Sequence, residues 1–529
     1  MPMTRRSALA RLAALAATSA LPRRMPAATA PSDPLAGTIA HYLAGLDAGE
    51  WTATEITALA LERCAAHGAA WRAIDVLDPD GALAAAREAD ARRRGDRRLG
   101  PLDGVPVFAK SIHDMRGLPT TASNAEWARL FPEAVARDAI EVARLRAGGA
   151  IVLGKAAADD FAYRGNGTSS HTGQVLNPYD PGGTRTPGGS SAGAAVAVAG
   201  ALAFAALGTD DGGSNRIPAQ FTGVVGMKPT FGLVPRTGVI PTWPYLDTHG
   251  PLARTVADAA RLLAVIAGAD PADPFSLDGA ADLPALHDDA LDGARLGLVE
   301  AHVPRAAMTA EALATWDRAV ADLRAAGAVV VPFTPAVTLH TVQEAFADAA
   351  TERGDVPPNP KSAAPTASAL YRYFEGRSDD PRAAIRRGYR AYRAFYDVLP
   401  ASYEDCEPLF EKHMTDDAAA QSFARSRAAV LQALADSMHT QRVQAMVYPT
   451  MPFNAPRAVD SWPDVRTPLG YGNWLGLPEV SVPAGYGSDG LPALNLSIVG
   501  LPGEDAQVLA LAHAFERQAP RFRTPPRPT

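Results

Sequence analysis

The stretch TPGGSSAGAAVAVAGALAFAALGTDDGGSNRIP, which runs from Thr186 to Pro218, decides the interpretation of this chain. It consists of two turns rich in glycine and serine, joined by an apolar run of small residues. One turn presents Ser190 and the other presents Ser214. A serine becomes a nucleophile when a neighbouring base activates it. Two serines on such turns therefore indicate catalysis if the chain also supplies a base.

A candidate base lies upstream of both turns. The segment GPLDGVPVFAK, residues 100–110, ends an apolar, strand-like run with a solitary lysine, Lys110. A charged ammonium is costly to bury unless it is paired, and burial favours the neutral amine. A lysine whose pKa falls from about 10.4 towards about 7–8 can act as a general base at neutral pH.

Short apolar runs alternate with amphipathic helices through most of the chain. Thr52 and Glu55 form a capping box in front of a helix, and the alanine-rich run 192–207 is expected to be one buried helix. Further helices are predicted over 81–94, 138–147, 309–326 and 505–517, and strands over 105–109, 150–154, 294–300, 327–333, 445–449, 479–484 and 494–499. This alternation predicts an α/β fold, although periodicity does not give the strand order.

Residues from about 340 to 440 differ in character from the rest of the chain. They are charged, predicted to be helical, and hold many of the aromatic residues: Tyr371, Tyr373, Phe374, Tyr389, Tyr392, Phe395 and Tyr396. Such an insertion could cap a substrate pocket. Tyr389, Tyr392 and Tyr396 share one helical face, so they could equally be packing residues. The proline- and arginine-rich tail, 518–529, is predicted to be disordered.

The first thirty residues resemble a twin-arginine export signal. Arg5 and Arg6 precede an apolar run, and Ala28-Thr29-Ala30 supplies a cleavage site of small residues. Arg11 interrupts the apolar run, which argues against a stable membrane anchor. We therefore expect an exported protein, periplasmic or secreted, whose mature part is a single domain over 31–529.

Composition and charge restrict the partners. The chain is 47% hydrophobic and 20% charged, with a net charge of −7, and loss of the leader would remove five arginines and no acidic residue. An acidic surface without a basic stripe argues against nucleic acid as a partner.

Cys64 and Cys406 lack metal-ligand spacing and are expected to be buried free thiols, although export would permit a disulfide. No metal, phosphate-binding loop or organic cofactor is predicted.

Over residues 35–515 the chain resembles the amidase signature family. The resemblance rests on GPLDGVPVFAK, on TPGGSSAG, on GTDDGGSNRIPAQFTGVVGMKPTFGLVPRTG and on NWLGLPEVSVPAG, which occur in this order. It implies a large, mixed, twisted β-sheet covered by helices on both faces. Ser111, Ala192 and Asn215 depart from the family pattern, and none of them removes a catalytic group.

The resemblance also implies a catalytic triad. Ser214 would be the nucleophile, Ser190 would bridge through a cis peptide bond, and Lys110 would be the base. Asp210 and Arg216 would pair to brace the loop. The oxyanion hole would be formed by backbone amides of Asp211, Gly212, Gly213 and Ser214.

The predicted reaction is hydrolysis of a small carboxylic amide through an acyl-serine intermediate, as in exported peptide amidases or aryl acylamidases. Carbamates and cyclic amides are alternative substrates within the same family. A second alternative is the A subunit of a tRNA-dependent amidotransferase, which the export signal and the acidic surface oppose.

A third alternative is an α/β-hydrolase esterase, because Gly189–Gly193 also fits G-x-S-x-G with Ser191 at its centre. That motif needs a strand directly before it and a downstream histidine; His249 has no distinctive context, and His113 and His171 are expected to be ordinary loop residues.

Overall fold

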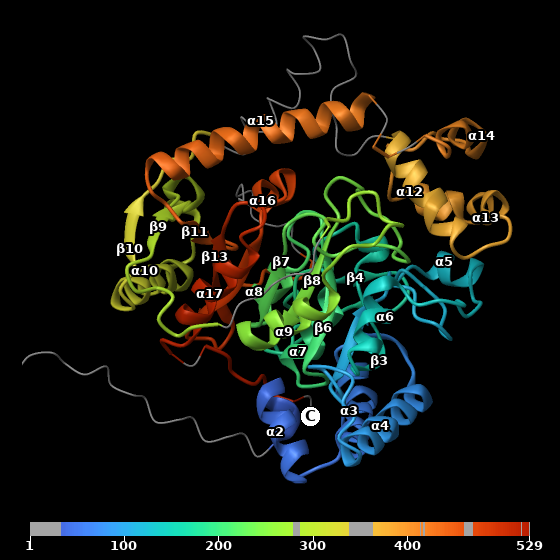
Figure 1. Ribbon diagram of the computed structural model, residues 1–529, viewed down its shortest axis with the longest axis horizontal. Coiled ribbons are helices and arrows are strands. Elements are labelled where there is room, and N and C mark those ends of the chain that lie inside the picture. The colour runs from blue at the N-terminus through green and yellow to red at the C-terminus, as the bar shows by residue number, and fades with distance from the viewer. Residues whose placement is uncertain are drawn as a thin grey trace, which may run out of the picture. The chain divides into compact units, whose positions relative to one another are not determined.

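The centre of the fold is a mixed sheet that contains eleven strands among the described residues (Figure 1). The computed structural model describes residues 33–278, 286–337, 363–412, 414–415, 418–459, 469–519 and 521–527. The strands follow the order β1-β3-β2-β6-β8-β7-β12-β13-β11-β9-β10. Their bounds are β1 Ile74–Leu77, β2 Pro106–Lys110, β3 Ile151–Ala156, β6 Ala205–Asp210, β7 Val225–Lys228, β8 Thr248–Ala253, β9 Arg295–Leu298, β10 Val329–Pro332, β11 Ala445–Pro449, β12 Glu479–Tyr486 and β13 Pro492–Val499. Strands β4 (Thr168–Ser169) and β5 (Gly173–Gln174) form a separate pair.

Parallel pairing places the predicted base beside the second serine turn. Strand β2 pairs in parallel with both β3 and β6, so the carboxyl ends of β2 and β6 lie at the same edge of the sheet. Lys110 is the last residue of β2, and Asp210 is the last residue of β6. Strands β9, β10 and β11 form a second parallel group, and the strands between the two groups pair antiparallel.

Helices cover both faces of this sheet, as the sequence resemblance implied. Helices α7 and α9 both contact β6 and β8, but α7 contacts α8 whereas α9 contacts α6 and α17. The two groups therefore lie on opposite faces. The helices are α2 Ile39–Ala48, α3 Ala53–Arg63, α4 Pro79–Arg94, α5 Ala125–Leu130, α6 Ile140–Ala147, α7 Ala192–Ala199, α8 Arg216–Phe221, α9 Val256–Ile266, α10 Ala310–Ala325, α12 Ala363–Glu375, α13 Pro381–Arg393, α14 Tyr403–Cys406, α15 Ala418–Thr440, α16 Leu469–Leu475 and α17 Asp505–Glu516.

The prediction of one helix over 192–207 is wrong. Helix α7 ends at Ala199, Gly200 caps it, and Ala201 takes a left-handed conformation with φ of 54°. The chain then enters β6, a fully buried strand in the middle of the sheet. Small apolar residues fit a buried helix and a buried central strand equally well, so the composition of this run did not reveal the break.

The other predicted elements are present within a few residues, including the capping box of Thr52 and Glu55 at the start of α3. The sequence analysis missed β1, β7 and β8. Strand β8 contains Gly250 and Pro251, residues that normally argue against an interior strand. Here Pro251 pairs opposite Leu207 of the central strand β6.

The prediction of a disordered C-terminal tail is wrong for Arg521 and its neighbours. The Arg521 guanidinium donates hydrogen bonds to the carbonyl of Ala484 at 3.1 Å and to the carboxylate of Asp322 at 2.8 Å. The backbone amide of Arg523 donates to the Tyr486 hydroxyl at 3.1 Å. These contacts fasten the tail to strand β12 and helix α10.

The aromatic residues of the predicted insertion pack against the sheet domain. Tyr392 and Tyr396 are completely buried, and each hydroxyl donates at 2.7 Å to a backbone carbonyl, of Pro241 and Phe161 respectively. Tyr389 donates to the carbonyl of Pro400 at 2.6 Å. The packing interpretation therefore holds for these three tyrosines.

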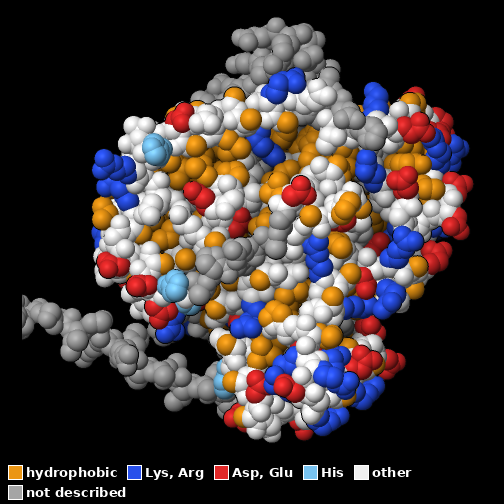
Figure 2. All heavy atoms as spheres, in the orientation of Figure 1, with side chains coloured by type: hydrophobic (Ala, Val, Ile, Leu, Met, Phe, Trp, Pro, Cys, Tyr) orange, Lys and Arg blue, Asp and Glu red, His pale blue; other side chains and the backbone are white. Residues whose placement is uncertain are grey.

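The predicted leader, residues 1–30, lies outside the described residues, and residues 34–529 form one compact unit. Within the part of the chain that the structure describes, no helix combines the length and apolar character that crossing a membrane requires. Cys64 and Cys406 are both buried and free, as predicted. On the face shown in Figure 2, acidic and basic side chains are interspersed over the surface.

We predict that Gly193→Ala destabilises the protein, because α7 packs too closely on its neighbours to admit a side chain. A Cβ atom at Gly193 would lie 2.2 Å from the carbonyl oxygen of Ala73 and 2.6 Å from the backbone of Ala157. Overpacking of this kind costs about 1–3 kcal/mol. Denaturant unfolding measures the change, and Gly376→Ala is the control, since a Cβ there meets nothing within 4 Å. Equal stability of both variants would contradict the close packing of α7.

Candidate active site

Lys110 is completely buried at the carboxyl end of β2. Its Nζ donates hydrogen bonds to Ser190 Oγ at 2.7 Å and to Thr209 Oγ1 at 2.8 Å. Burial lowers the pKa of Lys110 to about 8, although the negative charges of Asp211, Asp159, Asp210 and Asp247 act in the opposite direction. The neutral amine, which is the form that a base requires, is therefore a minor fraction at pH 7 and about half near pH 8.

Ser190 lies on the turn in front of α7. The peptide bond between Gly189 and Ser190 is cis, as the resemblance implied. Gly189 has no room for a side chain, because a Cβ atom there would lie 2.2 Å from Asp159 Oδ2 and 2.9 Å from the amide nitrogen of Gly167. The carbonyl of Ser190 accepts a hydrogen bond from the amide of Asp159 at 3.3 Å. The turn thus presents Ser190 Oγ to Lys110 from a backbone held on both sides.

Ser214 lies on the loop between β6 and α8, beside the first turn. Its carbonyl accepts a hydrogen bond from the amide of Ser191 at 3.2 Å, which ties the two serine turns together. Ser214 lines a cavity of about 490 Å³ together with Asp211, Gly212, Tyr163 and Trp243. It is therefore the predicted serine that an entering molecule can reach. Tyr389, Tyr392 and Tyr396 do not line this cavity; Tyr396 packs behind Trp243 at 5.1 Å between ring centroids.

In the loop that carries Ser214, one backbone amide is bonded within the loop and the others are the predicted oxyanion donors. Gly213 donates its N–H to Asp210 Oδ1 at 2.7 Å, so this amide is committed to the loop and leaves the predicted set of oxyanion donors. Gly213 must be glycine, because its φ is 114° and a Cβ atom would lie 2.7 Å from Leu469. The amides of Asp211, Gly212 and Ser214 remain the predicted donors.

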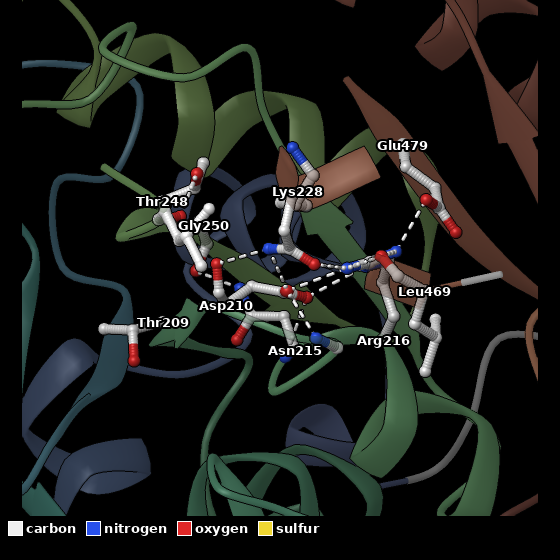
Figure 3. A network of polar contacts seen from close by, with 12 residues as sticks. Thr209, Asp210, Asn215, Arg216, Lys228, Thr248, Gly250, Leu469 and Glu479 are labelled. Carbon is white, nitrogen blue, oxygen red and sulfur yellow. Dashed lines mark hydrogen bonds and ion pairs between the residues drawn. The ribbon is translucent and has the colours of Figure 1, made fainter. Parts of the chain in front are cut away.

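The ion pair between Asp210 and Arg216 is present and completely buried (Figure 3). Arg216 donates to Asp210 through two nitrogens, at 2.9 and 2.8 Å, and to Glu479 Oε2 at 2.6 Å. Burial alone would raise the pKa of Asp210, but the charge and hydrogen bonds of Arg216 hold it below its usual range. Asp210 remains an anion that also accepts from the amides of Gly213 and Asn215, and it thereby shapes the loop that carries Ser214.

The sequence analysis did not single out three residues of this site. Thr209 gives Lys110 its second hydroxyl partner from the neighbouring strand β6. Asn473 donates to the carbonyl of Asp210 at 2.9 Å and to its carboxylate at 3.0 Å, and Glu479 binds Arg216. Asn473 and Glu479 both lie in the segment NWLGLPEVSVPAG that carried the family resemblance, so the signal was present.

Two carboxyl groups near Lys110 have raised pKa values. Burial, together with the adjacent Asp247 carboxylate, raises the pKa of Asp211 well above its usual range. Burial also raises the pKa of Asp159 to about 7, although the amides of Thr168 and Gly167 oppose this. Where either carboxyl group is ionised, its negative charge raises the pKa of Lys110 and so opposes the effect of burial.

The arrangement around Ser191 does not suit a nucleophile. Its Oγ is completely buried and accepts from the amide of Thr209, and its single proton has two acceptors within reach, the carbonyl of Thr209 at 3.2 Å and Asn215 Oδ1 at 3.1 Å. No strand lies directly before it, since the preceding strand β5 ends at Gln174 and residues 175–191 are described throughout. Ser191 is thus a structural link between the two serine turns.

Comparison with known proteins agrees with this arrangement. The chain matches the Amidase family over residues 55–509. The protein belongs to the amidase signature family. Peptide amidase from Stenotrophomonas maltophilia superimposes with a TM-score of 0.74 and 31% identity, covering 93% of this chain and 99% of that one. An amidase family protein from Bacillus anthracis str. Ames gives a TM-score of 0.72 and 26% identity over 93% of this chain and 92% of its own.

Curated relatives of similar sequence identity are named as amidotransferase subunits. The A subunit of glutamyl-tRNA(Gln) amidotransferase from Symbiobacterium thermophilum is 35% identical over 492 residues, which is 89% of this chain and 94% of the relative. Its counterpart from Chloroflexus aurantiacus is 35% identical over 502 residues, which is 91% of this chain and 96% of the relative. Family and neighbours together support an amide-cleaving enzyme that acts on small amides.

We predict that kcat/KM for an amide rises with pH and levels off above an inflection near pH 8. Below this pH, Lys110 is increasingly protonated and cannot accept a proton, since burial lowers its pKa from 10.5 to about 8. A pH–rate profile of the wild type measures the inflection. Lys155→Met is the matched control, because Lys155 is a second buried lysine with a pKa of about 8 that lies outside the serine turns. A profile that rises without a break to about pH 10.4, the ordinary lysine value, would contradict the assignment.

Proposed function

We propose that the protein hydrolyses a small carboxylic amide through an acyl-Ser214 intermediate, with Lys110 as base and Ser190 as the bridging hydroxyl. The observation that carries this proposal is the contact of 2.7 Å between Lys110 Nζ and Ser190 Oγ, made by a lysine with a lowered pKa beside the turn of Ser214. A buried amine that can lose its proton near neutral pH and that touches a serine hydroxyl is what proton transfer requires.

The reaction begins when Ser214 Oγ attacks the amide carbonyl carbon. Its proton passes to Ser190 Oγ while the Ser190 proton moves to Lys110 Nζ, which becomes an ammonium. The carbonyl oxygen becomes an oxyanion, which accepts hydrogen bonds from the backbone amides of Asp211, Gly212 and Ser214. A single donor of this kind contributes roughly 2.7–4 kcal/mol in related acyl-transfer sites.

The intermediate collapses when the carbon–nitrogen bond breaks. Lys110 returns its proton through Ser190 to the departing nitrogen, which leaves as ammonia or an amine, and the acyl group stays on Ser214. Water then attacks the ester by the same route and gives the carboxylic acid and free Ser214. Each proton that Lys110 accepts is thus given back within the same half-reaction, and no external cofactor enters the scheme.

The cavity favours an amide with an apolar or aromatic part. Tyr163, Trp243 and Ile217 supply apolar surface around Ser214, and Arg164 and Asn166 supply polar groups. Peptide amides and anilides fit this lining, and similarity to the Stenotrophomonas maltophilia peptide amidase supports the first of them. Carbamates and cyclic amides are further candidates of the same chemistry.

A second candidate function is that of the A subunit of an amidotransferase, favoured by 35% identity over nearly the whole length of such proteins. An amidotransferase would release ammonia from glutamine for a partner, whereas the proposed hydrolase acts alone. Ammonia release by the isolated chain from L-glutamine and from C-terminally amidated dipeptides separates the two. A preference for glutamine would favour the amidotransferase.

We predict that Ser214→Ala abolishes hydrolysis whereas Ser191→Ala leaves it within an order of magnitude of wild type. Loss of a serine nucleophile costs about 10⁴-fold or more. Product formation from an amidated dipeptide, an anilide, an aliphatic primary amide and an aryl carbamate is followed by mass spectrometry for both variants. Ser191→Ala is the matched control, because it removes a buried hydroxyl from the neighbouring turn. Retained activity in Ser214→Ala would overturn the proposal.

We also propose export through the twin-arginine leader of residues 1–30, on the strength of the sequence pattern. A reporter fused behind residues 1–35 is expected to reach the periplasm, and Arg5→Lys with Arg6→Lys is expected to hold it inside the cell. Fractionation of the two fusions measures this. Equal distribution of both reporters would contradict export by this route.

A further inference from the structure

A buried cluster beside the serine turns joins three segments that are distant in the sequence. His113 follows β2, Glu141 lies in α6, and His249 lies in β8. Glu141 Oε2 is 3.0 Å from His113 Nε2 and 3.0 Å from His249 Nδ1, and each residue can place one ligand atom within 4.8 Å of the other two. His113 and Glu141 are completely buried, and His249 is 2% exposed.

The hydrogen bond of His113 Nδ1, the ring nitrogen that does not face Glu141, indicates which nitrogen of the neutral ring carries the proton. His113 Nδ1 lies 3.1 Å from the carbonyl oxygen of Lys110, which can only accept, so Nδ1 carries the proton. In the neutral ring the lone pair is then on Nε2, which faces the carboxylate oxygen of Glu141. Two acceptors 3.0 Å apart in a buried site repel each other unless a positive charge lies between them.

His113 Nε2 and Glu141 Oε1 have no hydrogen-bond partner among the described residues, although both atoms are buried. One nitrogen of each histidine lies 3.0 Å from the same carboxylate oxygen, Glu141 Oε2, so the three residues offer ligand atoms that are close enough to share one cation.

We infer that His113, Glu141 and His249 bind a divalent cation of the zinc type. Two imidazole nitrogens and one carboxylate oxygen are a ligand set that zinc accepts in proteins, with a fourth position for water or another ligand. Ligating histidines commonly donate their other ring N–H to a backbone carbonyl, as His113 does to Lys110. The site lies outside the proposed reaction and does not depend on it.

His249 also lines a second cavity, distinct from the one beside Ser214. His249 and Asp247 line this cavity of about 430 Å³, together with Arg236, Arg372 and Tyr373. A water molecule or a small anionic ligand could reach the cation from there. The cation would also cross-link β8, α6 and the segment after β2, and so hold the carbonyl of Lys110 in place through the His113 ring.

The sequence analysis predicted no metal because the three ligands are scattered and form no spacing motif. Only the pairing of β8 with β6 and the packing of α6 bring them together.

Cobalt binding to the full chain tests the inference. The purified protein is treated with a chelator, its folded state is checked by thermal unfolding, and Co²⁺ is then added while visible absorption is recorded. We expect a single equivalent to produce the intense d–d bands of four- or five-coordinate cobalt, and Zn²⁺ to displace it. A folded wild type that shows only the weak spectrum of hydrated cobalt would overturn the inference.

Substitutions of the proposed ligands test whether the cation binds at these residues. His249→Gln and Glu141→Gln are each expected to weaken cobalt binding by about 100-fold or more, since even supporting residues of metal sites contribute about 10–100-fold. His513→Gln is the matched control, because His513 also contacts a carboxylate, Asp288, at 3.0 Å but lies in α17 outside the cluster. Unchanged binding in a folded His249→Gln variant would overturn the inference. If the variants do not fold, the wild-type cobalt spectrum decides by itself.

Discussion

The burial of the Lys110 amine without a directly paired carboxylate is the constraint on which the site depends. Its hydrogen-bond partners among the described residues are the hydroxyls of Ser190 and Thr209, and its pKa falls to about 8. A charged ammonium would be poorly compensated in this place, so the fold holds an amine that is readily neutral. Parallel pairing of β2 with β6 supplies Thr209, and the turn in front of α7 supplies Ser190.

A second buried ionic group ties this half of the chain to the C-terminal half. Arg216 joins Asp210, at the end of β6, to Glu479, at the start of β12, while Asn473 of α16 binds the backbone and the carboxylate of Asp210. The loop that carries Ser214 is thus shaped by residues more than 250 positions further along the chain. The described residues from 34 onward accordingly form one compact unit.

Much of the site could be predicted because each part lies in a short motif. Lys110 ends an apolar strand, Ser190 and Ser214 lie on glycine-rich turns, and Asp210 and Arg216 flank one of these turns. The break between α7 and β6 could not be predicted, because alanine-rich residues suit both elements. The commitment of the Gly213 amide to Asp210 depends on the exact path of the loop, and the cluster of His113, Glu141 and His249 depends on packing between distant elements.

The central claim is that Ser214 is the nucleophile that Lys110 activates through Ser190. Labelling with a fluorophosphonate tests it most directly, since this reagent reacts with activated serines whatever the natural substrate is. The account predicts one adduct per chain, mapped by peptide mass spectrometry to Ser214, which forms faster as the pH rises towards 8 and is absent in Lys110→Met. An adduct on Ser191, or labelling of Ser214 that survives unchanged in Lys110→Met, would contradict it.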